Sequence, residues 1–331
     1  MLVLGVSSGC SSSEGPATYH GQVRALMERS CVSCHNDQGI APFSLEGFAN
    51  AQRYGEAALG EVEAGTMPPW LPSDECRSYK AERGLSHAEQ RALRDWVQGG
   101  MPEGLPEEYK APDVEPDPRE QLGPATLDLG FADAYAPSTE HHDDYHCFVL
   151  DLEGALKEAE GDGYASDKER YLRMLDVVPG NADIVHHVIV FLIPEAQSSE
   201  LEVLDAEEEG PGYTCFGGAG IGTAKFLGGW VPGSVPQPWD AQSAQRLPAR
   251  SRLVMQVHYH DADGAQDPAT HAKLWVSPDK PTNIIDVEPV ANQDLSIQPG
   301  DAESYQKALF PMLGWPGEIV ATFPHMHLLG S

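Results

Sequence analysis

Residues 184–192, Ile-Val-His-His-Val-Ile-Val-Phe-Leu, form a short apolar run that indicates the fold class. Similar short apolar runs occur at 147–150 and 252–259, and Gly/Pro-rich loops lie between the runs. Short β-rich runs separated by turn clusters are typical of a β-sandwich or a jelly roll. We therefore predict an all-β region that begins near residue 126.

Residues 17–105 have a helical pattern instead. Residues 19–29 place three apolar side chains on one helical face. The sequence Ser86-His-Ala-Glu89 is a capping box, and the helix that it opens ends at a Gly-Gly pair. We therefore predict a small all-α domain over residues 17–105.

The segment between these two parts has the composition of a linker. Residues 101–120 hold five prolines, seven acidic residues and two basic residues. Such a composition cannot bury a core, so it favours a stiff, acidic connection. We place this linker at residues 106–125.

The charge of the whole chain argues against two classes of partner. The 51 acidic and 21 basic residues give a formal net charge of -30. This excess of acid disfavours binding to nucleic acid or to an anionic lipid surface. The chain also has no run of 18 apolar residues, so we predict no membrane-spanning helix.

The N-terminus predicts export. A short apolar stretch and small residues precede Cys10, and a polar run follows it. This pattern resembles the end of a bacterial lipoprotein signal, although it lacks a basic region and a full-length apolar region. We therefore interpret residues 1–16 as a signal remnant and expect a periplasmic or outer-membrane lipoprotein, lipidated at Cys10. Export also permits disulfides, but the sequence alone does not pair Cys76, Cys147 and Cys215.

Cys31-Val-Ser-Cys34-His35 predicts the covalent attachment of a c-type haem. Two thiols one helical turn apart can reach the two vinyl groups, and the adjacent imidazole then faces the iron. A redox disulfide does not need the histidine, and no further ligands for a zinc site are evident nearby. Met67, in Gly-Thr-Met-Pro-Pro-Trp, is the favoured sixth ligand of the iron, and Met101 is its rival.

Three groups of histidines fall in predicted strands. They are His186-His187, His258-Tyr-His260 and His325-Met-His327. Imidazole is the common nitrogen ligand of copper and zinc, and residues i and i+2 of a strand face the same side. The adjacent pair is different, because neighbours on a strand face opposite sides and can share one metal only at a bulge or a strand end. Together the three groups predict a metal-binding protein.

These motifs resemble those of two kinds of known protein. The haem motif, the segment around Gly39, Met67-Pro-Pro-Trp and the helix around Trp96 look like the cytochrome-like domains that precede copper monooxygenase domains in some bacterial proteins. The histidine groups resemble, in order and in flanking residues, those of the type II copper, ascorbate-dependent monooxygenases. These enzymes are the relatives of peptidylglycine α-hydroxylating monooxygenase and dopamine β-monooxygenase. With the haem segment, the resemblance covers most of the chain. The matching histidine segments are Val185-His-His-Val-Ile-Val-Phe, Val254-Met-Gln-Val-His-Tyr and Pro324-His-Met-His-Leu-Leu-Gly.

The resemblance implies the ligands of two copper ions and one disulfide. By position, His186, His187 and His258 would bind an electron-transfer copper. The catalytic, oxygen-binding copper would take His325 and His327. The segments around Cys147 and Cys215 match segments whose cysteines are bridged in the family. Gln256 matches a glutamine near the first copper or simply fills its strand, and His260, which matches no ligand, is expected to face solvent.

The resemblance also implies the fold class. We expect a multidomain protein with a small all-α cytochrome c-like domain, then an all-β copper monooxygenase jelly roll over residues 126–281. The start of a second jelly roll would occupy residues 282–331. We expect this second one to be incomplete, because the sequence ends four residues after His327, before the methionine that the family's second copper takes. Phe323 replaces an arginine that grips the substrate carboxylate in peptide-amidating enzymes, which argues against a C-terminal glycine peptide as substrate.

The function that follows from the resemblance is hydroxylation of an activated C–H bond by a copper-dependent monooxygenase. Its partners would be O2, a small organic substrate and an electron donor, which is ascorbate or another reductant. The electrons would pass through the first copper and a haem c. The alternative, from another class, is a haem and copper electron-transfer or copper-binding protein without hydroxylase activity.

Overall fold

The structure is a computed structural model of the 331-residue chain. It describes residues 16–37, 39, 41–69, 79, 82–112, 116–290, 292, 294, 296–301, 303–309 and 317–322. The chain divides into two compact units, residues 1–285 and residues 286–331. The described residues of the second unit include no helix or strand. Within the described residues, no helix is both long and apolar enough to cross a membrane.

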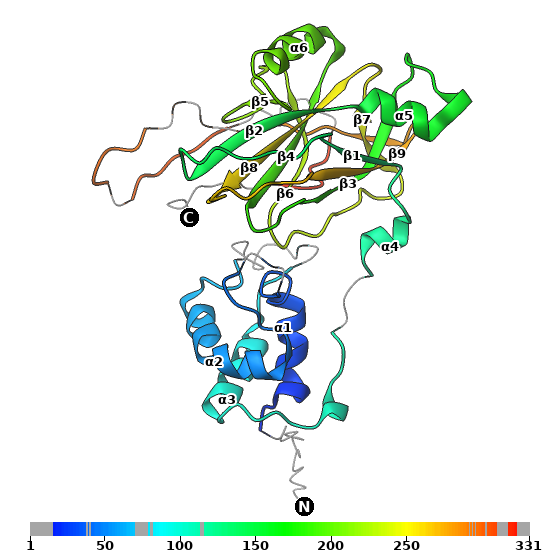
Figure 1. Cartoon of the computed structure of the whole chain (residues 1–331). Helices are drawn as coiled ribbons and strands as arrows, with labels where there is room; N and C mark the ends of the chain where they lie inside the picture. The colour runs from blue at the N-terminus through cyan, green and yellow to red at the C-terminus, as the bar shows by residue number, and fades with distance from the viewer. Residues whose placement is uncertain are drawn as a thin grey trace, which may run out of the picture. The chain divides into compact units, whose positions relative to one another are not determined.

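The first part of the first unit is helical, and Figure 1 draws it in blue to cyan. A π-helical turn leads into three helices, which are followed by a 3-10 turn and a short helix. These elements are η1 (Tyr19–Val23), α1 (Arg24–Ser30), α2 (Gly47–Ala64), α3 (His87–Gln98), η2 (Pro106–Glu108) and α4 (Pro118–Leu122). The predicted capping box at Ser86 is confirmed, because its hydroxyl accepts from the Glu89 amide and the Glu89 carboxylate accepts from the Ser86 amide.

A small apolar cluster holds these helices together. Its fully buried centre is Trp96 of α3, whose indole N–H donates to the Pro102 carbonyl at 2.9 Å. Met27 of α1 and Ala51 of α2 pack in the same cluster. The apolar positions of each helix recur every three or four residues, which is why one face of each is buried.

Two five-stranded sheets make up most of the remainder of the first unit (Figure 1). One has the order β1-β9-β3-β7-β10, with strands Leu127–Gly130, His271–Ser277, Arg170–Val178, Ser243–Leu247 and Asn283–Ile285. The other has the order β5-β2-β8-β4-β6, with strands Tyr213–Thr214, Asp143–Leu150, Arg252–His260, Val185–Ile193 and Lys225–Trp230. Every strand pair is antiparallel except β10 with β7.

β8, the central strand of the second sheet, is buried on both of its faces, which explains its continuous apolar run. One hydrophobic cluster takes side chains from both sheets, among them Leu274 of β9 and Met255 of β8. On the other face, Val254 of β8 packs with Leu201 of α6 (Ser198–Ala206). A strand covered on both sides loses the alternation of polar and apolar residues. Seven consecutive residues of β8 are buried for this reason.

The predicted fold class is wrong. The described residues form six α-helices and ten strands in two sheets, which is a mixed and mostly β fold without an evident all-α cytochrome domain. The helical residues belong to the same compact unit as the sheets. In addition, α5 (Leu152–Glu160) and α6 lie between strands. Each of these two helices has nine residues, too few for the helical period to stand out in the sequence.

The start of a second jelly roll, expected over residues 282–331, stays a prediction, but its first strand belongs to the first unit. β10 pairs in parallel with β7 and so completes a sheet of the first unit. The described residues after β10 contain no strand. Asn283–Ile285 finds its hydrogen-bond partners on β7, at the edge of a sheet of the first unit.

Candidate metal centre

The candidate centre lies where β2, β8 and β4 run side by side. β8 is the middle strand of the three and pairs with both neighbours. In these pairings, His258 of β8 lies opposite His187 of β4 and opposite Tyr145 of β2. Residues that are 71 positions apart in the sequence therefore meet across one ladder.

A β-bulge at the start of β4 brings the adjacent pair of histidines to one place. Val185 pairs with Tyr259 and His187 pairs with His258, so His186 is an extra residue in the ladder. A bulge breaks the strict alternation of side chains and re-aims the extra one. The sequence pattern allowed a shared metal only at a bulge or a strand end, and the structure has a bulge at this position.

The three imidazole rings converge through their Nδ1 atoms. The Nδ1 atoms of His186 and His187 are 3.1 Å apart, and those of His187 and His258 are 3.3 Å apart. One ligand atom from each of the three residues lies within 4.8 Å of the others. A metal about 2.0 Å from each nitrogen in tetrahedral geometry holds them about 3.3 Å apart. The three rings therefore fit one metal ion with little movement.

The protonation of these rings suits a metal ligand. His258 is 5% exposed, and burial lowers the pKa of His258 below its ordinary value. Burial also lowers the pKa of His186. A neutral imidazole offers a lone pair, whereas a protonated one repels a cation. These two rings are therefore held in the form that binds metal.

Two residues of β2 support His258, and the sequence motifs did not indicate this role for them. The ring of Tyr145 stacks on the ring of His258 at 4.1 Å, with 6° between the planes. The Asp143 carboxylate is 2.8 Å from His258 Nε2 and also contacts His260. The sequence shows that Asp143 and Tyr145 share a face of β2, because they are two residues apart. Their contact with His258 could be predicted only from the register of β2 against β8.

His260 does not join the three rings. Its Nδ1 is 2.8 Å from Asp143 and its Nε2 is 3.2 Å from the Asp261 carboxylate. Its side chain is half exposed, as expected for a residue that matches no ligand. Asp143, His258 and His260 also form a second group of possible metal ligands, which shares His258 with the first.

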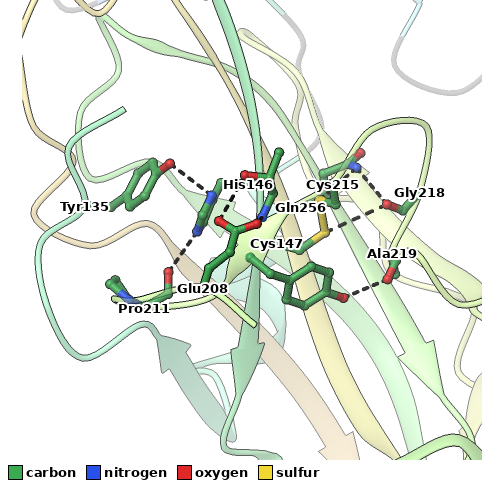
Figure 2. The surroundings of a disulfide bond; sticks show 11 residues. Tyr135, His146, Cys147, Glu208, Pro211, Cys215, Gly218, Ala219 and Gln256 are labelled. Carbon is green, nitrogen blue, oxygen red and sulfur yellow. Dashed lines mark hydrogen bonds between the residues drawn. A yellow bond between two sulfur atoms is a disulfide. The ribbon is translucent and has the colours of Figure 1, made fainter. Parts of the chain in front are cut away.

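Cys147 and Cys215 form a disulfide, the pairing that the resemblance implied (Figure 2). Cys147 lies on β2 and pairs with Gln256 of β8, two residues before His258. The amide of Gln256 donates to the Gly218 carbonyl at 3.1 Å and lies 3.3 Å from Cys215 Sγ. Gln256 therefore fastens the loop after β5 to the sheet.

The residues of the haem motif lie together after α1. Cys31 and Cys34 are not in a disulfide, and the Cys31 carbonyl accepts from the Cys34 and His35 amides. The Nδ1 atom of His35 is 3.1 Å from the Phe43 carbonyl. A proton on Nδ1 completes this hydrogen bond and leaves Nε2 to accept a metal, as a histidine ligand requires. Burial raises the pKa of Cys31 to about 11, so it is a protonated thiol at neutral pH.

The two candidate axial methionines have different surroundings. Met67 follows the C-terminus of α2 and is 43% exposed. Met101 packs against the helical cluster, with its sulfur close to Gly55. Met101 is partly buried, and a thioether that fills a gap beside a core has a structural role. Met67 is therefore the more accessible of the two methionines, and its role as a haem ligand stays a prediction.

Three predicted site residues lie outside the described residues. They are Cys10, His325 and His327. Comparison with known proteins adds no assignment, since neither a scan of protein-family models nor a search of curated proteins finds a match for this chain.

Proposed function

We propose that this protein binds copper through His186, His187 and His258, as the electron-transfer centre of a copper-dependent monooxygenase. The observation that carries the proposal is the convergence of three Nδ1 atoms at 3.1 and 3.3 Å. Three imidazoles suit copper or zinc, and copper(II) is bound more tightly than the other divalent first-row metals by a given nitrogen site. The resemblance to type II copper monooxygenases adds the expectation of redox chemistry.

The residues of the chain define what the centre can do. When bound, copper supplies a one-electron redox couple at this position. His258 is held by strand pairing on both sides, while His186 at the bulge is exposed. The site is therefore rigid on one side and open to solvent on the other. Such an arrangement suits electron exchange with a small reductant, for which we propose ascorbate or a similar molecule.

The catalytic half of the proposal rests on His325 and His327. By the resemblance, these residues would hold the oxygen-binding copper, where an activated C–H bond of a small organic substrate is hydroxylated. O2 and an electron donor are the other partners of this reaction. The sequence departs from peptide-amidating enzymes at Phe323, so we propose a substrate without a C-terminal carboxylate to be gripped.

We further propose covalent haem c at Cys31 and Cys34, with His35 as an axial ligand and Met67 as the second. The support is the hydrogen bond of His35 Nδ1 to the Phe43 carbonyl, which leaves Nε2 to face an iron. The haem would pass electrons between the donor and the copper. An exported lipoprotein anchored at Cys10 would meet the haem-attachment machinery and the oxidising conditions that the disulfide requires.

The second candidate function is electron transfer or copper binding without hydroxylation. Both possible ligand groups among the described residues contain His258, which favours a single copper centre. The two functions differ in whether O2 is consumed to hydroxylate a substrate. The test is oxygen uptake by the full chain loaded with copper and haem, supplied with ascorbate and a panel of small C–H substrates.

A monooxygenase should consume O2 in step with a hydroxylated product, and His258→Ala should abolish both. A carrier should show copper and haem reduction by ascorbate without product. Tight zinc binding with no copper preference would contradict both functions.

A further inference from the structure

Asp143 is a carboxylate that contacts one ligand of the candidate centre, His258. It lies on β2 opposite His260, and Tyr145, two residues on, lies opposite His258. Because residues i and i+2 share a face, Asp143 lies on the same face of the sheet as both histidines. One oxygen, Oδ1, is 2.8 Å from His258 Nε2 and 2.8 Å from His260 Nδ1.

These two distances assign the proton on His258. A carboxylate accepts hydrogen bonds and has none to donate, so each ring nitrogen at 2.8 Å is an N–H donor. A proton on His258 Nε2 leaves Nδ1 with a lone pair. That Nδ1 is the atom 3.3 Å from His187 Nδ1. The carboxylate therefore selects the tautomer that points a lone pair into the centre.

The orientation of the His258 ring depends on the same contact. Tyr145 stacks flat on one side of the ring and fixes its plane. A stack still allows a half turn about the Cβ–Cγ bond, because this turn returns the ring to the same plane. A flip would exchange Nδ1 with Cδ2 and remove the nitrogen from the centre. The hydrogen bond at Nε2 opposes this flip, because Asp143 lies on one side only.

His260 in turn holds Asp143. Both ring nitrogens of His260 are engaged, Nδ1 with Asp143 and Nε2 with the Asp261 carboxylate at 3.2 Å. Asp261 continues to His142, whose Nδ1 is 2.6 Å from Asp261 Oδ1. The half-exposed Asp143 is thus fixed by neighbours on β8 and on the adjoining loop.

We propose that Asp143 is a positioning residue, which orients His258 for metal binding through Nε2 and is itself anchored by His260. The inference rests on the proposed copper function for its consequence, but the tautomer that it assigns is a property of the metal-free protein. A carboxylate on the outer nitrogen of a histidine ligand strengthens metal binding, and its loss costs about 10- to 100-fold in affinity.

The first arm of the test uses metal-free protein. Long-range proton–nitrogen NMR with labelled histidine should show His258 protonated at Nε2 in the wild type. In Asp143→Ala the Nδ1-protonated form should appear. Asp128→Ala is the matched control, because Asp128 Oδ1 is 2.7 Å from His271 Nδ1 on the other sheet. Wild-type His258 protonated at Nδ1 would overturn the inference whether or not copper binds.

The second arm measures copper(II) affinity by competition with a chelator. Asp143→Ala should weaken binding about 10- to 100-fold, and Asp143→Asn should recover part of the loss because its amide oxygen can still accept. Asp128→Ala should bind as the wild type does. Equal affinity of Asp143→Ala and Asp128→Ala would contradict the inference. The inference would also be contradicted if the wild type bound a second copper ion and His260→Ala lost it, because Asp143 would then be a metal ligand. A wild type that binds no copper would overturn the proposed function and leave the NMR result to decide the role of Asp143.

Discussion

His186 reaches the centre because of one extra residue in β4. A regular strand would turn His186 and His187 to opposite faces, and the bulge between Val185 and His187 removes that restriction. The His-His pair could be recognised in the sequence as a candidate. The bulge could not, because it is defined by the pairing of β4 with β8, two segments that are far apart in the chain.

His146 is a second buried histidine, outside the centre, and it should make stability depend on pH. Its Nδ1 is 3.0 Å from the Tyr135 hydroxyl and its Nε2 is 2.9 Å from the Pro211 carbonyl (Figure 2). Burial lowers the pKa of His146 below the unfolded value of about 6.5. The unfolded chain therefore takes up the proton first, and the free energy of unfolding decreases as the pH falls below about 6.5.

Replacement of His146 by glutamine should reduce this acid dependence. Urea unfolding of the metal-free protein between pH 7 and pH 5 should show a shallower loss of stability in His146→Gln than in the wild type. His271, which is partly exposed on the other sheet, provides the control, and His271→Gln should follow the wild type more closely than His146→Gln does. Parallel pH profiles for His146→Gln and the wild type would show that this residue does not control the acid response.

At the scale of elements, one buried ion pair connects α5 to β3. Arg170 at the start of β3 has a side chain only 3% exposed, and both its Nε and Nη2 are 2.5 Å from the Glu160 carboxylate at the end of α5. Removal of one partner leaves an uncompensated buried charge. Glu160→Gln should therefore lower the free energy of unfolding by about 3 kcal/mol.

The exposed pair of Lys157 and Glu153 provides the comparison for that measurement. Both side chains are largely in solvent, where an ion pair contributes little. Glu153→Gln should leave the denaturation midpoint nearly unchanged. Equal effects of Glu160→Gln and Glu153→Gln would mean that the buried pair does not hold the helix to the sheet.

The disulfide is the other connection between elements that supports the centre. It closes a loop of 68 residues between β2 and the segment after β5. In the chain-entropy model such a link stabilises by up to about 4 kcal/mol. We expect Cys147→Ala/Cys215→Ala to lose about 2–4 kcal/mol of stability in urea. Reduced wild type should match the double variant, and a double variant as stable as the oxidised wild type would contradict this account.

The elements show which parts of the fold the sequence could predict. The strands at 184–192 and 252–259 were visible as apolar runs, and the helix after Ser86 was visible from its capping box. The nine-residue helices between strands were not, because their burial comes from packing on a sheet. The prediction of a separate all-α domain was wrong because a local helical pattern does not show how helices and sheets are grouped.

At the scale of the whole molecule, the ligands of the centre were predictable as residues but their surroundings were not. His187 and His258 are opposite each other only because β8 lies between β2 and β4. Asp143 and Tyr145 enter the site through the same sheet order. Sequence motifs name the groups that can bind metal, whereas the long-range pairing decides which carboxylate and which aromatic ring support them.

The haem proposal is tested on the intact chain matured in a bacterial periplasm. Haem should remain with the protein after acid–acetone extraction, because it is bonded to Cys31 and Cys34. Met67→Ala should lower the reduction potential, since a methionine ligand raises it. A pyridine haemochrome spectrum that shows no haem would contradict the proposal. An unchanged reduction potential in Met67→Ala would indicate that Met101 is the axial ligand.

We propose that three imidazoles from two strands form one copper site, and copper(II) titration of the chain followed by EPR tests this. We expect about one tight equivalent with a type II spectrum and nitrogen couplings. His258→Ala should abolish this signal, while His260→Ala, which removes only the anchor of Asp143, should keep the signal with a weaker affinity. Tight binding that survives His258→Ala, or that is lost in His325→Ala instead, would contradict the claim.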